Sequence, residues 1–181
     1  VKNGKTWFPN VDVSKWWDSG NTGANTAGEN NPTSPEESVV VKGKAAKLQS
    51  TWIGFIGIGA FASASMFTGN FVDIDGTNGI LSFGQPFTAK PTKLTGYYKY
   101  TPVNIDYMEQ WDSKVDPDLK SGDSDQCIIY IALCTKIMDS TNPKSRQLFD
   151  PNDASVIAYG ELGRKEAVSG EEANGYKKVF Q

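Results

Sequence analysis

The stretch GILSFGQPFTAKPTKLTGYYKYTPV, residues 79–103, predicts two β-strands joined by a connection that Pro86 and Pro91 bound. The second strand, residues 94–101, alternates strictly between two sets of side chains. One set is Leu94, Gly96, Tyr98 and Tyr100, and the other is Thr95, Tyr97, Lys99 and Thr101. A period of two is typical of an antiparallel strand with one buried and one solvated face. We therefore expect the face of Tyr98 to lie in the core and the face of Tyr97 to meet solvent.

Further strands follow from similar patterns elsewhere in the chain. They are predicted at residues 39–41, 45–52, 65–75, 80–83, 126–135 and 154–162, and residues 179–180 resemble the opening of another. Residues 45–52 alternate, which indicates one solvated face. Residues 126–135 are nearly all apolar, which indicates a central strand covered on both faces. With 18 glycines and 9 prolines, the composition also suits a turn-rich all-β chain.

Two segments are read as connections. Residues 19–37, SGNTGANTAGENNPTSPEE, are too rich in Gly, Asn, Thr and Pro for a helix or a strand, so we expect a long surface loop. Residues 54–65 contain a GxxGxG string without the strand–helix setting of a nucleotide-binding loop. Its small residues predict a close approach of the chain to a sheet or to a ligand. Within the strand at 65–75, Thr68 and Gly69 predict a bulge, and residues 76–79 predict a tight turn.

The composition of the 181-residue chain excludes several classes of function. A net charge of −3 without a basic block argues against nucleic acid or an anionic membrane as a partner. The absence of histidine removes Ser-His-Asp triads and His-dependent metal sites. Residues 49–72 carry no charge, but their glycines and hydroxyl side chains argue against a membrane-spanning segment. Cys127 and Cys134, in one apolar run, would lie roughly 23 Å apart on a strand, so we expect both thiols to be free.

Several motifs resemble those of one bacterial family. They are WWDSGN (16–21), AAKLQS (45–50), MFTGNF (66–71), GQPFTAKPTKLTGYYKY (84–100) and RQLFDPNDASVIAYGEL (146–162). Over nearly its whole length, the chain thus resembles the putative carbohydrate metabolism domain family. The resemblance implies an exported β-sandwich domain of the bacterial cell surface or periplasm, in a secreted protein or a lipoprotein of a system that harvests glycans.

Pattern and resemblance together predict the fold. We expect one all-β domain over residues 1–181, an antiparallel β-sandwich of the jelly-roll type. Similar family members carry further strands, which implies that this chain lacks its C-terminal strands. The patterns leave the oligomeric state open.

The function that we expect first is non-catalytic binding of a glycan or oligosaccharide. Aromatic rings at a strand face or a loop rim can stack on the C–H faces of pyranose rings, and neighbouring polar groups then fix the hydroxyls. The candidate ligand-binding residues are Tyr97, Lys99, Trp52 and Trp111, with Trp16 and Trp17 as further aromatic candidates. Each of these aromatics could instead pack in the core or at its rim.

Two other function classes stay open from the residues alone. A glycoside hydrolase would need a carboxylate pair, for which Asp106, Glu109 and Asp112 are candidates. A structural or adhesive sandwich would need neither carboxylates nor a sugar platform. We expect no catalytic residues and no cofactor, although an acidic turn could hold a structural calcium ion instead of being merely solvated. The acidic residues of that turn are Asp116, Asp118, Asp123 and Asp125, and Asp73 with Asp75 forms a second, weaker pair.

Overall fold

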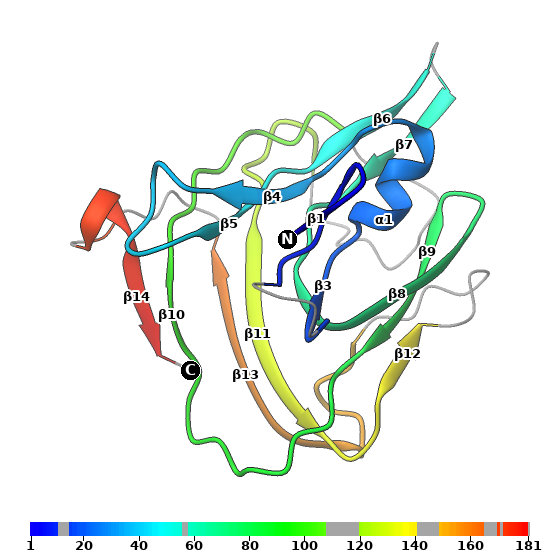
Figure 1. The fold of residues 1–181 in the computed structure, drawn as a ribbon. Coiled ribbons are helices and arrows are strands. Elements are labelled where there is room, and N and C mark those ends of the chain that lie inside the picture. The colour runs from blue at the N-terminus through cyan, green and yellow to red at the C-terminus, as the bar shows by residue number, and fades with distance from the viewer. Residues whose placement is uncertain are drawn as a thin grey trace. The chain divides into compact units, whose positions relative to one another are not determined.

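A computed structural model describes residues 1–10, 15–55, 58–107, 120–140, 149–164, 170 and 172–180. Strands dominate these residues, alongside one single-turn α-helix and two 3₁₀ helices (Figure 1). In chain order the elements are β1 (Lys2–Asn3), β2 (Thr6–Trp7), β3 (Trp17–Asp18), α1 (Asn21–Ala24), η1 (Asn25–Ala27), β4 (Thr33–Glu36), β5 (Ala45–Leu48), β6 (Thr51–Phe55), β7 (Ile58–Ala62), β8 (Phe67–Asp75), β9 (Asn78–Phe83), β10 (Thr95–Tyr98), β11 (Cys127–Cys134), β12 (Met138–Ser140), β13 (Val156–Arg164), η2 (Ala173–Gly175) and β14 (Lys177–Phe180), where η marks a 3₁₀ helix. The all-β prediction is confirmed.

The chain divides into two compact units. The first comprises Val1–Ala89 and Cys134–Ser155, and the second comprises Lys90–Leu133 and Val156–Gln181. No helix in the described ranges is long and apolar enough to cross a membrane, which agrees with the reading of residues 49–72. Cys127 and Cys134 form no disulfide in the described part of the chain, as their spacing predicted.

The largest sheet of the first unit has four strands in the order β12-β9-β8-β3. Strands β8 and β9 form the hairpin whose strands and turn were predicted, and Gly76 enters the turn with φ +63°. The bulge lies elsewhere than predicted, because the register shifts between Phe71 and Asp73. Gly69 instead allows a close approach of the strands, since a Cβ atom there would lie 2.1 Å from the carbonyl oxygen of Ser82.

Two further pairings of the first unit correct the predicted strand at residues 45–52. Strand β5 pairs with β4, and β6 pairs with β7 in a separate hairpin, so the alternating stretch is divided at Gln49 and Ser50. The strand expected at residues 39–41 is wrong, because these residues form bends. A short β-branched run is therefore a weak strand signal.

The segment predicted as a long surface loop, residues 19–37, is wrong in its burial and in its structure. It contains α1, η1 and β4. Ser19 and Asn21 are 0% and 1% exposed, the most deeply buried side chains among the described residues. Turn-forming residues here build a compact polar segment because their side chains supply the hydrogen bonds that a regular element would obtain from its backbone.

In the second unit, β10 pairs with β14, and β11 pairs with β13. Tyr98 is 8% exposed and Tyr97 is 47% exposed, so the predicted faces of this strand are confirmed. The strand opening at residues 179–180 is also confirmed, because both residues belong to β14. The prediction that residues 126–135 are covered on both faces is wrong, since Ile128 of β11 is 54% exposed.

Candidate functional site

Trp52 lies on the solvent-facing side of the β6–β7 hairpin. Its partner across the hairpin is Phe61, and the neighbouring pair, Gly54 and Gly59, adds no side chain to that side. The rings of Trp52 and Phe61 are 45% and 42% exposed, whereas Ile53 on the opposite side is buried. The hairpin thus presents two neighbouring aromatic side chains to solvent, which we call the Trp52–Phe61 face.

The two glycines explain how Trp52 can lie close to the hairpin backbone. A Cβ atom on Gly59 would stand 2.9 Å from Trp52 Nε1 and 2.3 Å from the carbonyl oxygen of Ile53. Any larger residue at this position would push the indole away from the strand. The GxxGxG string was predicted to approach a sheet or a ligand closely. In the structure, Gly59 of this string lies close to the backbone of β6 and to the Trp52 indole.

Tyr97 and Lys99 lie together in the second unit, on the β10–β14 ribbon. Tyr97 pairs with Lys178 of β14, and the Nζ atom of Lys178 lies 5.9 Å from the centre of the Tyr97 ring. Lys99 Nζ donates a hydrogen bond of 3.1 Å to the carbonyl oxygen of Asn174. This exposed ring therefore has one cation, Lys178, within the usual range of a cation–π contact.

The other predicted site residues fall in different places. Trp111 lies outside the described residues, and Trp52 belongs to the first unit, whereas Tyr97 and Lys99 belong to the second. Trp16 is exposed and Trp17 is half-buried beside a cleft. The structure thus unites Tyr97 with Lys99 in one ribbon and assigns Trp52 to another unit.

The predicted acidic candidates carry little further information. Asp106 is exposed, and Asp123 accepts a 2.8 Å hydrogen bond from the backbone N–H of Lys120 within a turn. Four other acidic candidates lie outside the described residues, namely Glu109, Asp112, Asp116 and Asp118. Across the described ranges, no three Asp, Glu, Cys or His side chains gather closely enough to hold a metal ion.

A cleft of about 450 Å³ lies in the first unit, between the beginning of the chain, β3, α1 and β8. Its apolar lining comes from Phe8, Trp17 and Phe71, and its polar lining includes Lys15, Thr22 and Asn70. These three polar residues are exposed. A concave surface that combines aromatic rings with a few polar groups is the usual composition of a small-ligand site.

The wall of the cleft at β3 is held by side chains that bond to the backbone. The carboxamide of buried Asn10 donates to the carbonyl oxygen of Trp17 at 2.6 Å and accepts from its N–H at 2.8 Å. Both carboxylate oxygens of Asp18 are engaged as well, one by the N–H of Ser19 and one by the N–H of Phe71, each at 2.8 Å. These bonds fix β3 against β8, so the cleft is formed before any ligand arrives.

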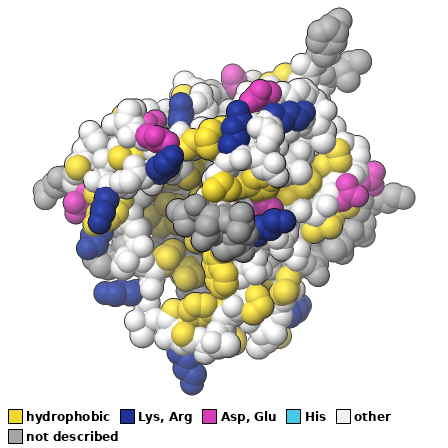
Figure 2. Space-filling view, in the orientation of Figure 1, with side chains coloured by type: hydrophobic (Ala, Val, Ile, Leu, Met, Phe, Trp, Pro, Cys, Tyr) yellow, Lys and Arg dark blue, Asp and Glu magenta, His cyan; other side chains and the backbone are white. Residues whose placement is uncertain are grey.

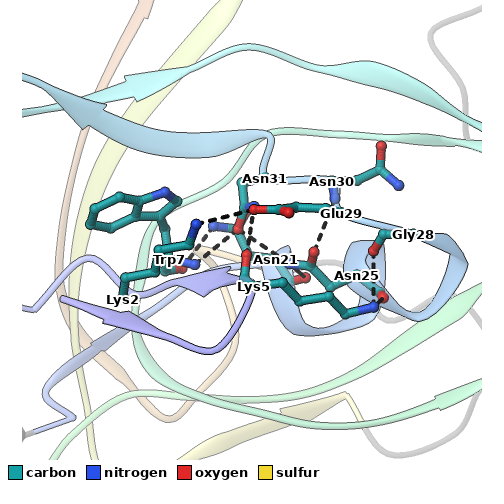
Figure 3. A network of polar contacts seen from close by, with 9 residues as sticks. All are labelled: Lys2, Lys5, Trp7, Asn21, Asn25, Gly28, Glu29, Asn30 and Asn31. Atoms are coloured by element: carbon teal, nitrogen blue, oxygen red, sulfur yellow. Dashed lines mark hydrogen bonds and ion pairs between the residues drawn. The ribbon is translucent and has the colours of Figure 1, made fainter.

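A network of asparagines fixes helix α1, which forms another wall of the cleft. The Asn21 carboxamide donates to the carbonyl oxygens of Trp7 and Thr33 and accepts from the N–H of Thr33. Figure 3 shows Asn21, Asn25 and Asn31 converging between Trp7 and the helix, with dashed lines marking the bonds between them. The same network holds Lys5, which donates to the carbonyl oxygen of Gly28 at 3.0 Å.

The cleft was missed by sequence reasoning because its residues come from distant segments. Trp17 was named as an aromatic candidate, but Lys15, Thr22 and Asn70 carry no motif that links them. The one local signal was the density of Asn and Gly in residues 19–37, which was read as a loop.

The charged side chains are dispersed on the face that Figure 2 shows. Figure 2 shows Lys and Arg side chains dispersed over the visible face, among apolar and polar groups, without a continuous basic patch. A nucleic-acid surface would concentrate these cations along one groove or stripe.

Comparisons with known proteins identify the family of this chain. One family description, putative carbohydrate metabolism domain, matches residues 3–178, which is nearly the whole chain. Neither the search of curated proteins nor the search of solved structures gave a match. The chain therefore belongs to the putative carbohydrate metabolism domain family.

Proposed function

We propose that this chain is a non-catalytic carbohydrate-binding domain of a bacterial surface glycan-utilisation system. The observation that carries the proposal is the Trp52–Phe61 face, where two large aromatic side chains lie side by side in solvent. Family membership supports a role connected with carbohydrate.

The placement of the two rings favours binding over a packing role. Ile53 points to the opposite side of the hairpin and is buried, whereas Trp52 is 45% exposed. An exposed indole that lies against the glycine backbone is held in place at little cost in conformational entropy when a ligand binds. Such a ring can stack on the apolar C–H face of a sugar, and a neighbouring ring extends the contact to the next sugar unit.

Tyr97 and Lys99 are a second proposed contact surface for the same class of ligand. Tyr97 supplies an exposed ring, and Lys99 and Lys178 supply hydrogen-bond donors beside it. Trp111 stays a predicted binding residue. Stacking and hydrogen bonding of this kind require no cofactor.

The proposal includes the setting of the domain. We propose a β-sandwich of the jelly-roll type, exported to the cell surface or periplasm. Antiparallel pairings throughout both units and the family's resemblance to sandwich domains support this fold. The family resemblance supports export.

The test is glycan binding by the intact chain and by one matched pair of variants. A glycan array selects a ligand, and calorimetry then compares the wild type with Trp52→Ala and with Phe87→Ala. Phe87 is an exposed aromatic residue of the same unit that lies outside any strand, so it serves as the control. We expect Trp52→Ala to weaken binding by about 1–2 kcal/mol, the effect of losing one central aromatic contact.

The same experiment can overturn the proposal. Phe61→Ala should also weaken binding, by a smaller factor, because Phe61 is the partner ring on the same face. Circular dichroism spectra of the three variants should match that of the wild type, since all three side chains are solvent-exposed. Binding that is unchanged in both Trp52→Ala and Phe61→Ala, or no array signal at all, would show that the Trp52–Phe61 face is not a sugar platform.

A further inference from the structure

The cleft at β3 has a feature that its packing role does not explain. Lys15, on its lining, has φ +51°, a left-handed backbone conformation that non-glycine residues rarely adopt. Its carbonyl oxygen accepts a hydrogen bond of 3.3 Å from Gln85 Nε2, and the carbonyl oxygen of its neighbour Trp16 accepts one from the N–H of Gly69. The surrounding strands therefore hold Lys15 in an unfavourable conformation, an arrangement that tends to occur at ligand-binding positions.

The Lys15 ammonium is an exposed charge on the lining of this cleft. Its side chain has no ion-pair or hydrogen-bond partner among the residues that the structure describes. The carboxylate of Asp18, the acidic residue on the lining, accepts hydrogen bonds from two backbone N–H groups and keeps its negative charge, but it forms no ion pair with Lys15. The other lysine on the lining, Lys2, lies 3.1 Å from the carboxylate of Glu29. A ligand that enters the cleft therefore meets the ammonium of Lys15, which forms no ion pair with the described residues.

The remaining lining suits a sugar ring. Trp17, Phe8 and Phe71 offer apolar surface, while Thr22 and Asn70 offer a hydroxyl and a carboxamide that form no side-chain hydrogen bond within the described part of the chain. Free hydroxyl and carboxamide groups can donate to and accept from ligand hydroxyls. The volume of about 450 Å³ is of the size that small-molecule sites usually have.

We propose that this cleft binds a sugar unit that carries a carboxylate, with Lys15 as the ion partner of that carboxylate and Thr22 and Asn70 as partners of the hydroxyls. The choice of a sugar rests on the proposed function, whereas the choice of an anion rests on Lys15 alone. The site is distinct in its residues from the Trp52–Phe61 face, which has no charged side chain in the paired strands β6 and β7.

The experiment uses trisaccharides of galacturonate and of glucuronate, with their methyl esters as neutral counterparts. Calorimetry on the intact chain should show binding of an acidic trisaccharide, about tenfold or more tighter than its ester, because the ester cannot accept a charge-assisted hydrogen bond as strongly. Affinity for the acid should also fall with added salt. Acetate should bind far more weakly than the trisaccharide, because it lacks the hydroxyls and the ring.

Three lysine variants separate charge from fold. Lys15→Asn removes the cation but keeps a residue that tolerates the left-handed conformation, and should lose about tenfold or more in affinity. Lys15→Arg keeps the charge and should stay within about threefold of the wild type. Lys42→Asn removes an exposed lysine away from the cleft and should change nothing. Thermal melts of all three confirm that the fold is retained.

Several results would overturn the inference. They are failure of both acidic trisaccharides to bind, equal binding of acid and ester, and unchanged binding in Lys15→Asn. If acetate binds as well as the trisaccharides, the cleft is a simple anion site and the sugar assignment is wrong. The proposed function is judged separately, by Trp52→Ala against neutral glycans, so either idea can fail while the other survives.

Discussion

Two regions of this protein reverse the ordinary relation between composition and burial. The polar segment around α1 contains Ser19, Asn21, Asn25 and Thr33, all of which are at most 3% exposed. The β11–β13 pair of the second unit contains long apolar runs, yet Ile157 is 63% exposed. Hydrophobicity alone would have predicted an exposed polar segment and a buried β11–β13 pair.

The difference lies in what each region can bond to. In the polar segment, carboxamides replace the missing backbone ladder. The Asn21 amide donates to the carbonyl oxygens of Trp7 and Thr33, and the Asn25 amide donates to that of Asn21. In the β11–β13 pair, the two strands are paired, but one side of the sheet is exposed in the described residues. That side carries Ile128, Tyr130, Ile157 and Tyr159. Burial of a side chain thus depends on whether hydrogen-bond partners and covering elements are present. Amino-acid composition reports neither of these.

The sharpest way to test this account of the polar segment is Asn21→Ala. It removes three hydrogen bonds, with donor–acceptor distances of 2.8, 2.5 and 3.0 Å, and leaves buried backbone groups of Trp7 and Thr33 without a partner. We expect a loss of roughly 3 kcal/mol in the free energy of unfolding, measured by denaturant titration.

The neighbouring exposed residue supplies the control for Asn21. Thr22→Ala, on the same short helix, should stay within about 0.5 kcal/mol of the wild type. An Asn21→Ala variant that is as stable as Thr22→Ala would mean that the asparagine network is not what keeps this segment buried.

Tyr100 offers the opposite case, a polar group of the second unit that lacks such a partner. Its hydroxyl is buried and forms no hydrogen bond within the described residues, and burial, followed by the charges of Asp125 and Cys127, raises the pKa of Tyr100 to about 12. Tyr100→Phe should therefore raise the free energy of unfolding by about 1 kcal/mol. Tyr97→Phe, at an exposed ring, is the control and should be neutral. Destabilisation by Tyr100→Phe would reveal that the hydroxyl is bonded.

The pH dependence of Tyr100 follows from the same burial. A folded-state pKa above the unfolded value of about 10 means that the folded protein keeps this proton longer. The contribution is fully present below about pH 10 and is lost as pH rises through about 12. Since the pKa of Tyr159 is also raised to about 12, absorbance titration should show one late-titrating tyrosine fewer in Tyr100→Phe than in the wild type.

The exposed side of the β11–β13 pair should tolerate polar substitution. Ile157→Thr should change the free energy of unfolding by less than about 0.5 kcal/mol, because this side chain is mostly in water already. The matched control is Ile53→Thr in β6, where a buried isoleucine is replaced and the cost should exceed about 1 kcal/mol. Comparable losses in the two variants would show that something covers Ile157 in solution.

The smallest expected effect concerns the end of the polar segment. The Glu36 carboxylate accepts hydrogen bonds from the hydroxyl of Ser38 at 2.6 Å and from the backbone N–H groups of Ser38 and Val39, which lower the pKa of Glu36 to about 2. Its contribution to stability is present above the ordinary pKa of 4.5 and is lost as pH falls through about 2. In an NMR titration, Ser38→Ala should raise this pKa toward 4.5, and an unchanged value would rule out the hydroxyl as its main cause.

What could be predicted from the sequence was the part governed by local alternation. The β8–β9 hairpin and the two faces of β10 follow from spacing, because a strand with one wet side repeats every two residues. The burial of Asn21 could not be predicted, because its partners Trp7 and Thr33 lie 14 and 12 residues away and no propensity scale records such a match. The exposure of Ile128 could not be predicted either, because it depends on the absence of a cover and not on the strand itself.

The candidate site divides in the same way. Tyr97, Lys99 and Trp52 were predicted from residue type, and Tyr97 and Lys99 also from strand face. All three side chains are exposed. Lys15 was not predicted, because its conformation is imposed by Gln85 and by the strands around it. Concave sites assembled from distant segments need the register of several strands at once, which a single sequence does not reveal.

The bond between Asp18 and the backbone of Phe71 has a consequence for how the chain acquires its structure. These residues are 53 positions apart, and the hydroxyl of Thr33 reaches the carbonyl oxygen of Ser65 across 32 positions. Closing such long loops costs chain entropy that is recovered only once both ends are in place. The β8–β9 hairpin, by contrast, can form from contacts between adjacent segments. During folding, the asparagine-rich segment should therefore dock last, onto a hairpin that is already present, and substitutions within it should accelerate unfolding far more than they slow folding.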